Sequence, residues 1–204
     1  MDRSAGILMP ISSLPSPYGI GTFGKAAYRF ADFLHEAGQK YWQLLPLGPT
    51  SYGDSPYQAF STFAGNPYFI DLDTLIADDL LTQTEVDACA WGTEPRYVDY
   101  GKIYESRFAL LEKAKARGWS RDREAVAAFE AENARWLPDY ALFMALKRRF
   151  DIKSWTEWPD EGARLHTPEA VARYRMELRE DVELFTYIQF LFFRQWSALK
   201  HYIN

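Results

Sequence analysis

The residues best suited to chemistry lie in one segment, 48–70, which is dense in glycine, proline, serine and tyrosine and has no sustained hydrophobic period. Tyr52, Asp54, Ser55 and Tyr57 there combine phenol rings with a carboxylate and a hydroxyl. A flat phenol ring can cover the apolar face of a sugar, while the polar oxygens bind its OH groups, as expected of a small-ligand site. The alternative, that the rings only pack the loop against the domain, is open at this point.

Other catalytic patterns in the sequence are weaker. Segment 19–24 matches G-x-G-x-x-G before an expected helix, but seven loop residues separate it from the preceding apolar run, and no acidic residue lies between Glu36 and Asp54. A dinucleotide site needs the first glycine directly after the strand and an acid about 20 residues later. We therefore interpret the glycines as a turn in which the chain approaches another part of the backbone.

A serine nucleophile and metal chemistry also have little support. Segment 53–57 resembles a nucleophile elbow but lacks the second glycine. His35, His166 and His201 adjoin no candidate nucleophile or metal ligand, so we expect them at the surface. No metal motif is present, and we expect neither a metal nor another cofactor.

Asp71 and Asp73 form the most suggestive pair of carboxylates. In an extended chain they would point to the same face and could serve glycoside chemistry. The favoured interpretation is that they cap a helix at about residues 74–77.

The elements that must position these residues begin with a strand–helix–strand unit. Apolar runs at 6–11 and 41–47 predict strands buried on both faces. Apolar residues at helical spacing predict a helix over 25–37, which Gly38 would end in a left-handed cap. Such a crossover predicts parallel strands.

The rest of the sequence is predicted to be mostly helical. Helices are expected at 84–89, 101–117 and 137–150, with a solvated helix at 119–135 and a loop at 151–168. Thr167 and Pro168 mark a further helix start, as N-cap hydroxyl and first-turn proline.

The last expected helix is apolar on every side. Eight of the ten residues from 184 to 193 are apolar, so the helix must be buried all round. Either a partner covers it, which allows self-association through this helix, or the sequence stops before its core is complete. We take this as a sign of truncation.

Composition excludes several classes of protein. The 204 residues carry a net charge of −5, which disfavours nucleic-acid partners and membrane-surface binding. The single Cys89 excludes an internal disulfide. Without a signal sequence or a long apolar run, we expect a cytoplasmic protein that does not cross a membrane. Aromatic residues are abundant, at 17%.

Taken together, short segments throughout the chain resemble the 4-alpha-glucanotransferases of the amylomaltase (disproportionating enzyme) type. The segments that carry the resemblance are 5–8, 12–16, 18–21, 42–49 (WQLLPLGP), 53–58 (GDSPYQ), 65–67 and 98–100. The likeness spans this whole chain but less than half of a family member.

The resemblance implies an α/β fold, a partial (β/α)8 TIM barrel with the first two strands and an inserted, mostly helical subdomain. Residues 1–50 would start the barrel, 51–168 would hold the sugar-site loop and the inserted subdomain, and 169–204 would form the long apolar helix leading to the rest of the barrel.

The resemblance also implies transfer of α-1,4-glucan segments between maltooligosaccharides, with retention and without cofactor. The family's nucleophilic Asp, acid/base Glu and stabilising Asp lie on later strands, so this chain would hold no catalytic residue and would be inactive alone. Tyr57 is similar to the ring beside the scissile bond, with Ser55 and Asp54 as neighbouring sugar contacts. Tyr52 and Tyr100 resemble a pair lining a secondary glucan groove.

Two other functions remain open. One is a free-standing, non-catalytic glucan-binding module, which would need a self-sufficient fold. The other is a helical interaction protein whose C-terminal helix docks onto a partner, which leaves the aromatic loop unexplained.

Overall fold

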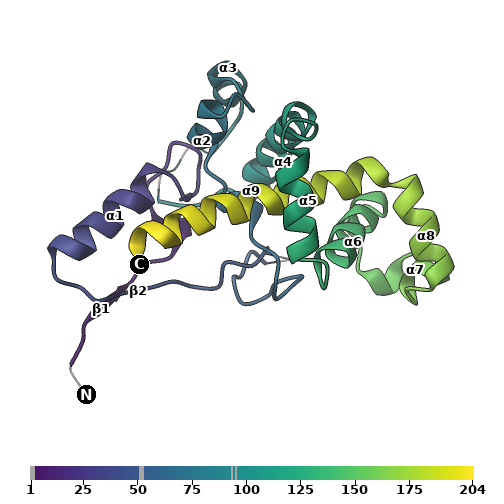
Figure 1. Cartoon of the computed structure of the whole chain (residues 1–204), viewed down its shortest axis with the longest axis horizontal. Helices are drawn as coiled ribbons and strands as arrows, with labels where there is room; N and C mark the ends of the chain where they lie inside the picture. The colour runs from purple at the N-terminus through teal and green to yellow at the C-terminus, as the bar shows by residue number, and fades with distance from the viewer. Residues whose placement is uncertain (1–2, 51–52, 93, 95) are drawn as a thin grey trace. The chain divides into compact units, whose positions relative to one another are not determined.

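The computed structural model describes residues 3–50, 53–92, 94 and 96–204. The contacts divide the chain into two compact units (Figure 1), Met1–Gly118 with Leu191–Asn204 as unit 1 and Trp119–Phe190 as unit 2. This division does not test the functional segments 1–50, 51–168 and 169–204, which stay a prediction.

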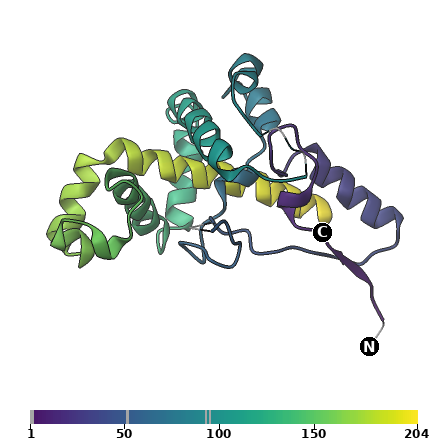
Figure 2. The same cartoon turned by 180° about the vertical axis from the view of Figure 1, so that it is seen from behind.

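Unit 1 begins with the expected strand–helix–strand crossover. Strand β1 (Gly6–Leu8) pairs in parallel with β2 (Tyr41–Gln43), and helix α1 (Lys25–Glu36) connects them. Gly6 is opposite Tyr41 and Leu8 is opposite Gln43. The two strands lie side by side in both views (Figures 1 and 2). The parallel pairing is confirmed, whereas both strands are shorter than predicted. After β1 the chain turns at Pro10 into the 3-10 helix η1 (Ile11–Ser13).

The expectation that both strands are buried on both faces is wrong. Ile7 and Trp42 face the same side and are half-buried, and the Trp42 ring packs 4.9 Å from that of Phe30 on α1. The opposite face carries Leu8, which is 50% exposed, and Tyr41, which is 65% exposed. The reason is that α1 packs on only one side of this two-stranded sheet.

Helix α1 ends as the sequence predicts. Gly38 has a φ of +67°, in the left-handed region that favours glycine. The N–H of Gln39 donates to the carbonyl of Leu34 at 2.9 Å, the long-range bond of a Schellman cap. The cap turns the chain back toward β2.

The core of unit 1 is aromatic. The ring of Phe23 lies 5.9 Å from Phe69, 5.1 Å from Phe192 and 5.5 Å from Trp196. Gly65 is packed so closely on Phe192 that a Cβ there would lie 2.1 Å from the ring. The other elements of unit 1 are η2 (Pro67–Phe69), α2 (Leu72–Ala77), α3 (Gln83–Asp87), α4 (Tyr100–Gly118) and the C-terminal part of α9 (Arg179–Ile203).

Unit 2 is helical and has a cluster of its own. Its elements are α5 (Arg123–Glu132), α6 (Leu137–Arg149), η3 (Trp155–Glu157), α7 (Glu161–Arg164), α8 (Pro168–Glu177) and the first part of α9. The cluster consists of Leu142, Leu146, Trp158, Ala163, Ala170 and Tyr174.

Helix starts in unit 2 follow local capping. Thr167 accepts the N–H of Ala170 at 3.3 Å, which confirms the predicted start of α8. The predicted loop 151–168 is wrong in part, because it contains η3 and α7. Helix α7 forms because the carboxylate of Asp160 accepts the N–H of Ala163 at 2.9 Å.

Helix α9 is buried along residues 184–192 by the chain itself. In unit 2 the Tyr187 ring lies 6.2 Å from Trp119, and its hydroxyl donates to Asp122 at 2.6 Å. In unit 1 Phe192 packs against Phe23. Residues 184–192 therefore leave water without a partner chain, so the expectation that a partner covers them is not needed to explain their burial. Among the described residues, none of the helices combines the length and apolar character needed to span a bilayer.

Candidate functional site

The segment after β2 is a loop closed at its base by backbone contacts. The N–H of Asn66 donates to the carbonyl of Leu47 at 2.8 Å, and Thr50 forms an antiparallel bridge with Ala59. Asn66 is 2% exposed, and its side chain accepts the N–H of Tyr68 at 3.0 Å, which starts η2. These bonds define where the loop leaves and rejoins the core.

A tight turn at the tip of this loop carries Tyr57. Gly53 and Asp54 have φ values of +88° and +56°, and asparagine or aspartate tolerates that region better than most residues. The Ser55 hydroxyl accepts the N–H of Tyr57 at 3.3 Å, and the N–H of Gln58 donates to the Ser55 carbonyl at 3.1 Å. The Ser55 side chain is therefore a support of the turn.

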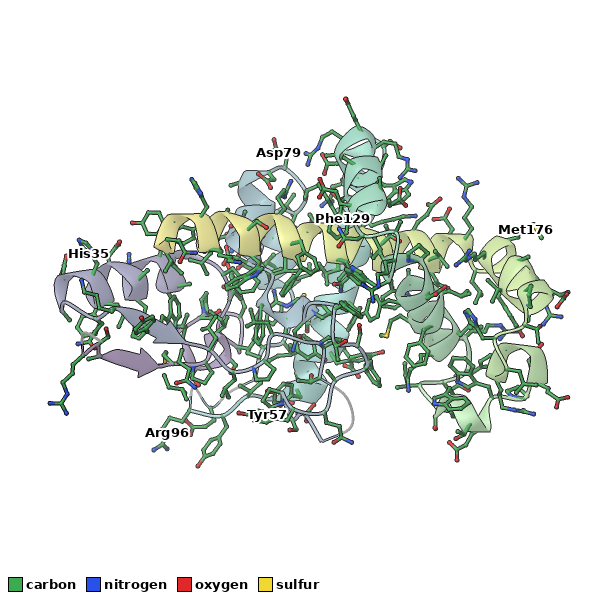
Figure 3. All side chains as sticks on the ribbon, turned by 60° about the horizontal axis from the view of Figure 1, so that its bottom comes forward. His35, Tyr57, Asp79, Arg96, Phe129 and Met176 are labelled. Atoms are coloured by element: carbon green, nitrogen blue, oxygen red, sulfur yellow. The ribbon has the colours of Figure 1, made fainter. Side chains whose placement is uncertain are left out.

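Tyr57, labelled in Figure 3, is 74% exposed. Among the described residues the ring is therefore not used to pack the loop, and it is open to a ligand. Tyr52, the other expected ring of this loop, lies outside the described residues.

Asp54 and Tyr100 come together, although they are far apart in sequence. Both line the same two hollows, which we call the inner and the outer hollow. Burial, with the nearby Asp54 carboxylate, raises the pKa of the Tyr100 phenol. The Tyr68 ring lies 6.0 Å from that of Tyr100, which places a second phenol beside them.

The inner hollow lies where the chain leaves the two strands. Pro10, Ile11 and Ser12 come one residue after the end of β1, and residues 45–47 and Thr50 come after β2. The remaining lining residues are Ile20, Asp54, Pro56, Asn66, Phe69 and Tyr100. Carboxyl ends of parallel strands are the usual location of ligand sites in α/β folds.

The outer hollow contains residues that the sequence argument did not select. Tyr97, which is 75% exposed, lines it together with Asp54, Glu94, Val98, Asp99, Tyr100 and Gly101. Residues 94–100 contain acids and phenols, as loop 48–70 does. This composition was the sequence feature from which these lining residues could have been predicted. Asp99 itself is engaged, because its carboxylate accepts the Lys102 N–H at 3.2 Å, which lowers its pKa.

The structure brings together Asp54 and Tyr100, whereas Tyr57 lines neither hollow. The arrangement therefore offers an exposed ring on a fixed turn and, separately, a polar and aromatic hollow. Both could contact a sugar. Their assignment as binding residues stays a prediction.

Asp71 and Asp73 do not form a pair of free carboxylates. Asp71 caps α2 by accepting the Thr74 N–H at 2.9 Å, which confirms the favoured interpretation, and it accepts the Thr22 hydroxyl at 2.9 Å. Asp73 accepts the Tyr18 hydroxyl. Burial and this bond raise the pKa of Tyr18.

The glycine segment is a turn of close approach, as interpreted from the sequence. A Cβ at Gly21 would lie 1.8 Å from the Ile11 carbonyl oxygen, and the Gly21 N–H donates to the Ser12 carbonyl at 3.2 Å. Gly24 lies against the Asp71 carboxylate. No phosphate role is needed to explain these glycines.

Histidines and metal ligands add nothing to the site. His35, His166 and His201 are exposed, as expected. In the part of the chain that the structure describes, no group of three histidine, cysteine or acidic side chains could hold a metal ion.

Comparison with known proteins identifies the family. The family model described as 4-alpha-glucanotransferase matches residues 9–204. The 4-alpha-glucanotransferase of Clostridium butyricum is 50% identical over 196 residues, which are 96% of this chain and 40% of that protein. The enzyme of Thermus thermophilus is 46% identical over 204 residues, covering 98% of this chain and 40% of that protein.

Solved structures agree. An amylomaltase from Streptococcus agalactiae, in complex with acarbose, has a TM-score of 0.96 and 42% identity over 100% of this chain and 41% of its own. An amylomaltase from Corynebacterium glutamicum, 18% identical with a TM-score of 0.67 over 98% of this chain and 28% of its own, shares the fold. The chain spans about 40% of the length of the curated relatives. It belongs to the 4-alpha-glucanotransferase family.

Proposed function

We propose that this chain is the N-terminal part of a 4-alpha-glucanotransferase that moves α-1,4-glucan segments from one maltooligosaccharide to another with retention. The family match and the share of its relatives that the chain spans support this assignment. The structural observation that supports it most is the exposed ring of Tyr57, on a turn held by Ser55 in the loop that follows β2.

The fold that belongs to this proposal is the beginning of a (β/α)8 barrel, with β1, α1 and β2 as its first elements and a mostly helical subdomain inserted after β2. Residues 1–50, 51–168 and 169–204 are the proposed functional segments. The parallel register and the inner hollow at the carboxyl ends of both strands support this arrangement.

The sugar contacts follow from side-chain chemistry. The Tyr57 ring covers one face of a glucose unit, and the Asp54 carboxylate accepts hydrogen bonds from its hydroxyl groups. Tyr100 and Tyr52 line a second stretch of the glucan. Ser55 reaches the sugar only through its free lone pair and proton, because its oxygen already accepts the Tyr57 N–H.

Covering the glucan matters for transfer because a retaining mechanism passes through a covalent glycosyl intermediate. That intermediate must react with an acceptor sugar before water reaches it. Rings that hold a long glucan favour the sugar acceptor, so this chain supplies substrate binding. The acids that break and form the bond are proposed to lie outside these 204 residues, which leaves the isolated chain inactive.

The test measures binding and catalysis separately. We expect the 204-residue chain to bind maltoheptaose in calorimetry and to release no glucose from maltotriose. Tyr57→Ala should weaken binding without changing the melting temperature, while Tyr41→Ala, at another exposed tyrosine, should leave binding unchanged. Glucose release by the pure chain would refute its proposed inactivity. Unchanged affinity for maltoheptaose in Tyr57→Ala would refute the proposed role of Tyr57 in binding.

A free-standing glucan-binding module is the second candidate. Residues 184–192 are buried within the chain, which removes the main objection to a self-sufficient fold. The exposed Leu8 and Tyr41 on β1 and β2 favour the first proposal instead, because they leave one face of the sheet uncovered. Both candidates expect binding of maltoheptaose, so the state of the chain separates them. A monomer that melts cooperatively would favour the module, whereas a chain that aggregates through its open sheet would contradict it.

A further inference from the structure

Unit 2 displays a tryptophan to solvent on the link between α6 and α7. Residues 151–157 are all exposed, and the Trp155 side chain is 51% exposed on the single turn of η3. Within the described residues its indole N–H has no hydrogen-bond partner and its ring has no aromatic neighbour. Tryptophan has the largest apolar surface to lose, so an exposed indole on a fixed turn is suited to binding a flat apolar face of a ligand.

The turn that carries Trp155 is held from behind. Trp158 is 2% exposed and packs 5.7 Å from the Phe143 ring and 5.5 Å from the Phe150 ring. Its indole N–H donates to the Lys153 carbonyl at 3.3 Å, and the Lys147 ammonium donates to the same oxygen at 3.1 Å. The exposed ring is therefore presented on a rigid support.

The approach to this turn is strained. Asp151 and Ile152 have φ values of +53° and +61°, a conformation that aspartate tolerates but that is costly for a β-branched residue such as isoleucine. Ile152 is also 47% exposed. Strain and apolar exposure occur in the same short segment, a combination that is common at binding sites.

The residues next to Trp155 in the sequence carry groups that bind sugar hydroxyls. The Ser154 and Thr156 hydroxyls lie 2.9 Å apart and keep further donor and acceptor capacity between them. Asp151 and Glu157 provide carboxylates that are exposed to solvent. A flat apolar ring flanked by hydroxyls and carboxylates matches a pyranose, which has one apolar face and a rim of OH groups.

We propose that Trp155, with Ser154, Thr156 and Glu157, forms a second contact site for α-1,4-glucan on unit 2, separate from the loop of Tyr57. Its ring stacks on a glucose unit while the hydroxyls and the carboxylate bind the rim. The choice of glucan as ligand rests on the proposed function.

The experiment uses the 204-residue chain labelled with ¹⁵N and maltoheptaose as the probe. Its seven tryptophans give separate indole signals, and Trp155→Phe assigns the one that matters. We expect the Trp155 indole signal to shift saturably as maltoheptaose is added. When Trp155→Ala is added to the Tyr57→Ala variant, the remaining affinity for maltoheptaose should fall about fivefold.

The controls separate this site from the loop. Met176→Ala removes another apolar side chain of unit 2, 76% exposed on α8 and labelled in Figure 3, and should not change the Trp155 response. Tyr57→Ala should also leave the Trp155 shift intact. A Trp155 signal that stays still while the loop signals move overturns this site and spares the proposed function. A chain in which neither responds overturns both.

Discussion

The side-chain amide of Gln195 makes both of its hydrogen bonds to the backbone of one residue, Asp71. Its Oε1 accepts the Asp71 N–H at 2.7 Å, and its Nε2 donates to the Asp71 carbonyl at 3.1 Å. Gln195 is 6% exposed and Asp71 is 5% exposed. Within unit 1 this pair joins α9 to the residue that caps α2.

Replacing Gln195 by leucine should therefore destabilise the chain strongly. The change keeps the volume but leaves a buried N–H and a buried carbonyl without partners, at a cost of about 2–4 kcal/mol in the free energy of unfolding. Urea unfolding measures it. Ser197→Ala, at an exposed position of the same helix, is the control and should change little. Equal stability of the leucine variant would show that the pair contributes nothing.

Substitutions at Gly21 and Gly38 test two different reasons for a glycine. Gly21 lies too close to other backbone for a side chain, and Gly38 has a left-handed backbone conformation. At Gly21 an added Cβ meets backbone atoms of Ile11 and Leu14, whereas at Gly38 it meets nothing within 4 Å but must accept a φ of +67°. Gly38→Ala should cost about 1–2 kcal/mol from the left-handed conformation. Gly21→Ala should cost about 3 kcal/mol or more, because backbone cannot move aside as a side chain can. Thermal melts of both variants check the order, and the reverse order would contradict the packing.

The closeness of Asp54 and Tyr100 can be tested by titration. The Asp54 carboxylate contributes to the raised pKa of the Tyr100 phenol, because a nearby negative charge disfavours phenolate. Asp54→Asn keeps the left-handed turn and should lower the Tyr100 pKa, followed by NMR of the labelled ring. Asp32→Asn, whose carboxylate accepts the Tyr202 hydroxyl at 2.6 Å, is the matched control and should not move it. An unchanged pKa in Asp54→Asn would place the two residues apart.

Glu85 should make stability depend on pH. Its carboxylate binds Arg117 through two bonds of 2.7 Å and 2.8 Å, and Arg117 with the Thr82 backbone holds its pKa well below the ordinary 4.5. A lowered folded-state pKa means that the contribution is complete above about pH 4.5 and is lost as the pH falls below it. Glu85→Gln should therefore be less stable than the parent at pH 7, and the gap should close in acid.

Denaturant unfolding at a series of pH values between neutral and acid measures that gap. Glu36→Gln, at an exposed position without an ion pair among the described residues, serves as the control and should show a gap that does not change with pH. A pH-independent gap for Glu85→Gln would mean that the lost hydrogen bonds, and not the charge, carry its effect.

Features governed by neighbours in sequence were predictable without a structure. The start of α8 at Thr167, the left-handed end of α1 at Gly38 and the cap at Asp71 each depend on atoms within a few residues. The motifs at 42–49 and 53–58 carried the family, which the comparisons confirmed. The local exception was α7, whose four residues are too few to show a hydrophobic period.

Tertiary structure alone decided which surfaces are covered and which residues meet. Gln195 and Asp71 are 124 positions apart, and no local pattern indicates that they pair. The same holds for Asp54 beside Tyr100, for the open face of β1 and β2, and for the burial of residues 184–192 by their own chain. Hydrophobic periodicity predicts that a side chain is buried, but it does not predict which residues cover it. The covering residues depend on how distant segments pack, because burial is a property of the folded chain and not of the local sequence.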